Sequence, residues 1–204
     1  MSVNSSTKVE TYECETCKDK EWIFDTKNNT AKPCKCREVK LYKKIIENCG
    51  ITEAFLSKTF ENFKVTTKAV EIAYKTAKDY VVKFEEIKKT KNNSIALLGQ
   101  VGSGKTHLSI AIANELMKQN VGVKYMQYRE DITRIKQLIT SEEEYSKELT
   151  KYKNASVLLI DDLYKAAIGK GQFGEYLNDA DKRVMFEIIN YRYFKGLPII
   201  ISSE

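Results

Sequence analysis

One segment of the chain combines glycines, a lysine and a threonine at the spacing of a phosphate-binding loop. It matches the pattern G-x4-G-K-[ST] at every fixed position and consists of Gly99, Gln100, Val101, Gly102, Ser103, Gly104, Lys105 and Thr106. Glycines let the backbone turn tightly and direct its N–H groups at phosphate oxygens, and a helix that begins at Lys105 adds the positive end of its dipole. We therefore predict that this segment, the P-loop, binds the phosphates of ATP or ADP.

The polar residues at the end of the P-loop have separate predicted roles. The ammonium of Lys105 is expected to reach the β- and γ-phosphates and to serve catalysis, and the hydroxyl of Thr106 is expected to ligate Mg²⁺. We include the next residue, His107, in the nucleotide-binding segment. Its ring is expected to pack the helix rather than to act as a catalyst.

A pair of aspartates, Asp161 and Asp162, follows the apolar run Val157–Ile160. Such a run is typical of a strand buried on both faces, and acidic residues at its end face the crevice where α/β folds bind ligands. We predict that Asp161 holds magnesium through water and that Asp162 orients or activates the attacking water. Glu204 ends another apolar run, where a γ-phosphate sensor is expected. Solvated turn aspartates and an ordinary strand end are the respective alternatives.

Four of the five cysteines form two close pairs near the N-terminus, Cys14-x2-Cys17 and Cys34-x-Cys36. This is close to the spacing of structural zinc sites, in which four thiolates leave no open position for water. We predict a structural zinc site that stabilises a segment too short to bury a core of its own. Disulfides or inert thiols are the alternatives.

The elements that must position these residues alternate along the chain from residue 94 onwards. Short apolar stretches typical of strands occur at residues 95–98, 123–127, 157–160 and 199–202. Helical periodicity occurs at residues 105–119, 130–139, 142–152 and 181–193, and an amphipathic helix at residues 68–84 precedes them. Alternating strands and helices predict an α/β fold, in which helices flank a parallel sheet.

The length of 204 residues allows one α/β domain and a small accessory module. We expect a zinc module at residues 1–50, a helical linker at 51–93 and the nucleotide domain at 94–204. The chain ends directly after a strand, so we expect a truncated product without a C-terminal lid. No apolar run approaches the roughly 20 residues that cross a bilayer, and the polar start lacks a signal peptide, so we expect a cytoplasmic protein.

Several basic and aromatic residues suggest a surface for single-stranded DNA. The net charge is +6, and most of the basic excess precedes residue 94. Tyr125, Tyr128 and Arg129 follow a strand, with Arg134 and Lys136 on the next helix. Interleaved aromatics and cations can stack on bases and neutralise phosphates, although a solvated helix face is the alternative. The glycine-rich stretch 169–174 is interpreted as a loop.

The assembled sequence resembles the bacterial and phage replicative helicase loaders of the DnaC/DnaI type, which are AAA+ ATPases, over most of its length. The resemblance rests on T-F-E-N-F at residues 59–63, G-Q-V-G-S-G-K-T-H-L at 99–108, L-L-I-D-D-L at 158–163 and the stretch 188–204. Asp162 stands where many AAA+ proteins carry glutamate, and Glu204 stands where many relatives carry asparagine. The cysteine-rich module is similar to that of the DnaI-like branch.

The resemblance implies an ATP-binding loader whose zinc module docks on the replicative DNA helicase and whose ATPase domain contacts single-stranded DNA. It also implies an arginine finger and a lid beyond Glu204, so this chain alone should hydrolyse ATP weakly. We expect ATP-dependent self-association and no membrane partner. A transposition helper ATPase, a nucleotide-gated adaptor without hydrolysis and a zinc-dependent DNA-binding regulator are the alternatives.

Overall fold

The computed structural model describes residues 12, 14–25, 28, 30–165 and 179–204. The polar start of the chain and the stretch 169–174 lie outside these residues. The chain divides into two compact units, Met1–Lys44 and Ile45–Glu204, and we describe each by itself.

The N-terminal unit contains a short antiparallel hairpin. Strands β1 (Trp22–Asp25) and β2 (Thr30–Pro33) pair with Trp22 opposite Pro33 and Asp25 opposite Thr30. Helix α1 (Lys35–Cys49) follows directly and continues past the unit boundary. The hairpin lies between the two cysteine pairs, and our sequence analysis assigned no element there.

The larger unit is the α/β fold that the sequence predicts. Its four strands are β3 (Ile95–Leu98), β4 (Val123–Gln127), β5 (Val157–Asp161) and β6 (Ile199–Ser203). All neighbouring pairs are parallel, in the order β3-β6-β5-β4. Because β6 lies between β3 and β5, the last described strand separates the strand before the P-loop from the strand before the aspartate pair.

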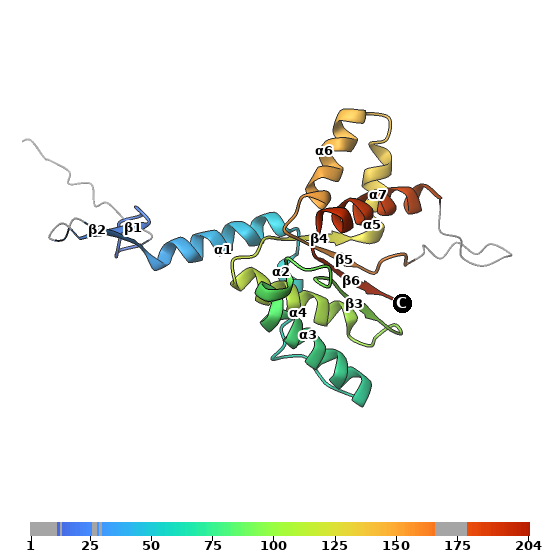
Figure 1. Cartoon of the computed structure of the whole chain (residues 1–204), viewed down its shortest axis with the longest axis horizontal. Coiled ribbons are helices and arrows are strands. Elements are labelled where there is room, and N and C mark those ends of the chain that lie inside the picture. Colours follow the sequence, from blue (N-terminus) through green and yellow to red (C-terminus); the bar gives the residue numbers. More distant parts are fainter. Residues whose placement is uncertain (1–11, 13, 26–27, 29, 166–178) are drawn as a thin grey trace, which may run out of the picture. The chain divides into compact units, whose positions relative to one another are not determined.

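Helices cover both faces of this sheet (Figure 1). Helices α3 (Lys68–Ile87) and α4 (Lys105–Lys118) lie on one face, with the short α2 (Glu53–Leu56) packed on α4. Helices α5 (Tyr128–Gln137), α6 (Glu142–Lys153) and α7 (Asp179–Lys195) lie on the other. All five residues of β5 are buried, as expected for a parallel strand covered on both faces. Within the described ranges, no helix has the length and apolar character required to cross a bilayer.

A buried arginine joins the end of α6 to the start of β6. Arg192 of α7 is fully buried, and its guanidinium donates to the carbonyls of Tyr152, Lys153 and Ala155 at 2.8–3.1 Å. It also donates to Pro198 O at 2.7 Å. Burial lowers the pKa of Arg192 to about 10. The guanidinium thus joins carbonyls at the end of α6 to the start of β6, which positions the strands that carry the site.

Candidate functional site

The P-loop connects β3 to α4 and depends on glycine at defined positions. Gly102 and Gly104 have φ of 78° and 89°, in the left-handed region that favours glycine. A Cβ at Gly104 would also lie 2.8 Å from the ring of Phe63. The ammonium of Lys105 donates to Gly99 O at 2.5 Å and to Gln100 O at 2.8 Å. The lysine therefore lies across the loop, with its charge held at the start of α4.

The carboxylate of Asp161 lies at the end of β5 and accepts three hydroxyl hydrogen bonds. Thr106 of α4 donates to Oδ1 at 2.9 Å, and Ser202 of β6 donates to the same oxygen at 2.5 Å. Tyr125 of β4 donates to Oδ2 at 3.1 Å. The two predicted magnesium residues, Asp161 and Thr106, are thus in direct contact. Hydroxyl and carboxylate oxygens are the ligands that Mg²⁺ prefers, so this group of residues fits the ion.

Our sequence analysis missed the part that Tyr125 plays here. The side chain is 6% exposed, and burial, followed by the charge of Asp161, raises the pKa of Tyr125. The phenol therefore stays a hydrogen-bond donor throughout the physiological pH range. The available signal was a tyrosine between the apolar residues Val123 and Met126 of a strand, since a buried phenol O–H needs an acceptor.

Asp162 and Glu204 lie together at the carboxyl ends of the neighbouring strands β5 and β6. The ammonium of Lys165 joins them, at 3.0 Å from Asp162 Oδ2 and 3.4 Å from Glu204 Oε1. The hydrogen bond to Asp162 raises the pKa of Lys165, so the ammonium stays charged. The sequence analysis named both carboxylates but not this lysine.

The segment Thr59–Phe63 packs against the start of α4 through His107. The imidazole Nε2 lies 2.8 Å from Thr59 O and 3.0 Å from Asn62 Oδ1. The ring of Phe63 meets the imidazole edge-to-face at 5.1 Å and stacks on Tyr74 of α3 at 5.7 Å. The ring of His107 is therefore used in packing, as the sequence analysis expected, and faces this segment.

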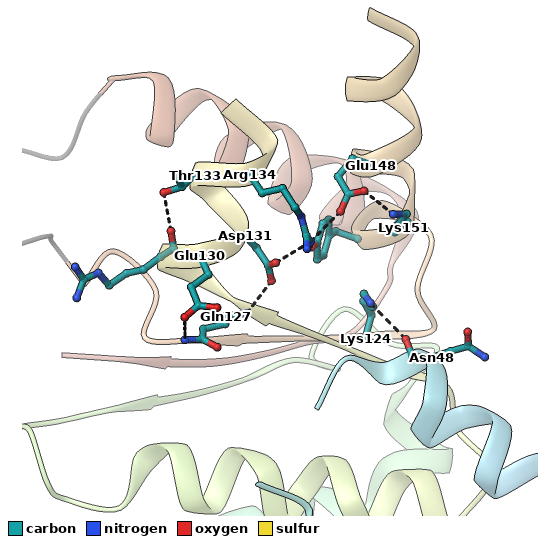
Figure 2. Close-up of polar contacts among 11 residues, drawn as sticks. Asn48, Lys124, Gln127, Glu130, Asp131, Thr133, Arg134, Glu148 and Lys151 are labelled. Carbon is teal, nitrogen blue, oxygen red and sulfur yellow. Dashed lines mark hydrogen bonds and ion pairs between the residues drawn. The ribbon is translucent and has the colours of Figure 1, made fainter. Parts of the chain in front are cut away.

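The predicted stacking surface for DNA is wrong for its two tyrosines. Tyr125 is 6% exposed and Tyr128 is 2% exposed, so neither ring is available to a base. Arg134 is held by Asp131 at 2.8 Å and by Glu148 at 3.0 Å, contacts that are drawn in Figure 2. Arg134 thus connects α5 to α6, and Tyr128 and Lys136 connect α5 to α7 through Asp181.

The four cysteines of the N-terminal unit converge on one point. Their sulfur atoms all lie within 4.8 Å of one another, with Cys14 Sγ 3.8 Å from Cys34 Sγ and Cys17 Sγ 3.4 Å from Cys36 Sγ. Tetrahedral zinc with Zn–S bonds of about 2.3 Å requires S–S separations of about 3.8 Å, so the cluster fits the ion. A hydrogen bond from the backbone of Cys17 lowers the pKa of Cys14 to about 7, whereas desolvation raises the pKa of Cys36, so the thiols of the cluster share their protons unevenly.

Comparison with known proteins supports the interpretation of the larger unit. A profile of the family described as "Bacterial DnaA ATPase domain" matches residues 56–202. The chain belongs to this family. It is therefore a replication-related AAA+ protein of an ATP-binding family.

Three individual proteins refine this assignment. The chain is 38% identical to the phage-like element PBSX protein XkdC of Bacillus subtilis (strain 168), over 95% of this chain and 72% of XkdC. Its sequence is 27% identical to that of DnaI in a crystal structure, with a TM-score of 0.61 and 76% of each chain covered. It is 25% identical to AMPPCP-bound DnaA from Aquifex aeolicus, with a TM-score of 0.56, over 72% of this chain and 42% of that one. The predicted relationship to DnaI-type proteins is confirmed.

Proposed function

We propose that the larger unit binds and hydrolyses ATP at the edge of the sheet where the P-loop meets β5. The hydrogen bond between Thr106 and Asp161 carries this proposal, because it joins the loop to the acidic strand. Thr106 and Asp161 would hold Mg²⁺, which supplies positive charge to the phosphates when bound. The ammonium of Lys105 would leave the carbonyls of Gly99 and Gln100 and bind the phosphates of ATP instead. The N–H groups of the P-loop would bind the phosphate oxygens that Lys105 does not contact.

In this site, Asp162 would act on the attacking water and Glu204 would sense the γ-phosphate. Asp162 directly follows β5 and Glu204 directly follows the neighbouring strand β6, at the carboxyl ends where α/β proteins bind their ligands. Because the carboxylate of Asp162 is held by Lys165, hydrolysis requires that ion pair to open.

The role of the whole chain is proposed to be helicase loading. The similarity to DnaI over 76% of both chains supports this role, together with the cysteine cluster of the N-terminal unit. The cysteines would hold zinc and stabilise the hairpin that docks on the replicative DNA helicase. Contact with single-stranded DNA and ATP-dependent self-association belong to the same proposal.

Calorimetry with ATP and ADP in the presence of Mg²⁺ tests the nucleotide site. Wild-type protein is expected to bind both, and Lys105→Ala is expected to weaken ATP at least about tenfold, because a charge-assisted contact to phosphate is lost. Lys118→Ala, on the exposed end of the same helix, is the matched control and should bind like wild type. Wild-type protein that binds neither nucleotide would contradict the proposal.

Gel filtration with a bacterial replicative DNA helicase tests the loader role. Co-elution that is lost in Cys36→Ser supports docking through the N-terminal unit. Nucleotide binding without measurable turnover, combined with retained co-elution, would instead favour a nucleotide-gated adaptor. Failure to co-elute under any nucleotide condition would contradict helicase loading while leaving the nucleotide site intact.

A further inference from the structure

The turn that follows β5 holds two non-glycine residues in the left-handed region. Asp162 has φ of 54° and Tyr164 has φ of 59°. This region is uncommon for any side chain and strained for a bulky one such as tyrosine. Such backbone conformations persist only where surrounding contacts hold them, and they concentrate at functional sites.

Hydrogen bonds to β6 hold this turn in place. The N–H of Asp162 donates to Ser202 Oγ at 3.0 Å, and the N–H of Leu163 donates to Ser202 O at 2.9 Å. The hydroxyl of Ser203 donates to Leu163 O at 2.7 Å. Within the turn, the N–H of Lys165 donates to Asp162 O at 3.0 Å. The turn therefore returns Lys165 to the carboxyl ends of β5 and β6.

Lys165 is linked to the start of the P-loop through Glu204 and the backbone of β6. Its ammonium pairs with Asp162 and Glu204, and each of these carboxylates is partly exposed. The residue before Glu204, Ser203, accepts a hydrogen bond at its carbonyl from the N–H of Gly99, at 3.3 Å. A partly exposed ion pair adds little to folding stability, so the pairs of Lys165 with Asp162 and Glu204 are not needed to hold the turn.

We propose that Lys165 is a second phosphate-binding residue, which exchanges its pairs with Asp162 and Glu204 for the γ-phosphate of ATP. This inference rests on the proposed ATP site. Lys105 begins α4, whereas Lys165 follows β5, so the two ammonium groups would approach the phosphates from different elements. ADP lacks the γ-phosphate and leaves Lys165 on its carboxylates. The same exchange frees Asp162 to orient water only when ATP is present.

Calorimetry with AMPPNP and with ADP, each with Mg²⁺, tests this assignment. Lys165→Met removes the charge and keeps most of the side-chain length, and it should weaken AMPPNP about tenfold or more while ADP stays within about twofold. Lys165→Arg keeps the charge and should retain the preference for AMPPNP. Lys182→Met is the matched control, because Lys182 pairs with Asp179 at 3.1 Å with the same spacing of three residues.

The outcomes separate this inference from the proposed function. Equal losses for AMPPNP and ADP, or no loss for either, would overturn the role of Lys165 while the ATP site stands. A Lys165→Arg variant that behaves like Lys165→Met would also overturn it, because charge would not be the cause. Wild-type protein that binds neither nucleotide overturns the proposed function, and this inference with it. Thermal unfolding of each variant checks the fold, and Lys165→Gln replaces the methionine variant if that one does not fold.

Discussion

The buried carboxylate of Asp161 is surrounded by neutral hydroxyl groups from three elements. Thr106, Ser202 and Tyr125 come from α4, β6 and β4, and all three donate to it within 2.5–3.1 Å. The three donors are uncharged, so they orient the carboxylate without pairing its charge with a cation. Tyr125 is the donor furthest from the P-loop, which makes it the cleanest residue for a test of this arrangement.

Tyr125→Phe should weaken Mg²⁺-dependent ATP binding about three- to tenfold, because Asp161 loses one donor and its orientation. Tyr80→Phe is the control. Tyr80 of α3 is also buried, and its hydroxyl donates to Asn93 O, just before β3, at 2.7 Å. Both variants should lose about 1 kcal/mol of unfolding free energy. Equal ATP affinities in the two variants, measured by calorimetry at fixed Mg²⁺, would contradict a role for Tyr125 in the site.

At the scale of elements, the segment Thr59–Phe63 connects α3 to the start of α4. Asn62 organises it: its Nδ2 donates to Ser57 O at 2.7 Å, and its Oδ1 accepts from the N–H of Thr59 at 2.9 Å. These two bonds fix the orientation of the amide. The Nε2 of His107 therefore faces two acceptors, Asn62 Oδ1 and Thr59 O, and must carry the hydrogen.

Asn62→Ala should lower the unfolding free energy by about 1–2 kcal/mol. The reason is that Ser57 O, the N–H of Thr59 and His107 Nε2 lose their hydrogen bonds to the amide of Asn62. Urea denaturation measures the loss, and Asn92→Ala in an exposed turn is the control. A double-mutant cycle with His107→Ala isolates the contact between the two side chains, with an expected coupling of at least about 0.5 kcal/mol. Strictly additive losses would show that His107 and Asn62 act independently.

At the scale of the whole molecule, the two compact units have different sources of stability. The larger unit buries an extensive apolar core around its sheet, whereas the N-terminal unit exposes much of its hairpin. We therefore expect the N-terminal unit to depend on metal ligation by its four cysteines for its fold. The single tryptophan, Trp22, lies in β1 under the guanidinium of Arg37 at 5.1 Å, so it reports on the N-terminal unit alone.

Removal of zinc should therefore change the emission of Trp22 and leave nucleotide binding intact. We expect one zinc ion per chain by elemental analysis, and a red shift of the emission when a strong chelator removes it. ATP affinity measured by calorimetry should stay within about twofold, since the P-loop lies in the other unit. Cys49→Ser is the control, because Cys49 lies outside the cluster, and it should retain the metal. Unchanged emission after complete metal removal would contradict a structural role for zinc.

Much of the fold follows from patterns short enough to read along the chain. Local spacing is enough to predict three features, namely the P-loop, the strand at Val157–Ile160 and the cysteine cluster. A tight turn, a buried strand and a metal cluster each require particular residue types at particular intervals. The alternation of apolar strands and amphipathic helices likewise determined the parallel sheet with helices on both faces. The hairpin in the N-terminal unit lacks such a pattern, since its strands have four residues each and are mostly exposed.

The sequence by itself determined that the chain carries a P-loop, an aspartate pair after a buried strand, and a four-cysteine cluster. Only the tertiary structure decided which side chains surround them. Tyr125, Thr106 and Ser202 meet Asp161 from positions 36 to 55 residues away, because strand order places β4 and β6 on either side of β5. The strained turn that returns Lys165 to the sheet edge depends on hydrogen bonds to β6. Such contacts follow from packing between distant segments, on which local spacing carries no information.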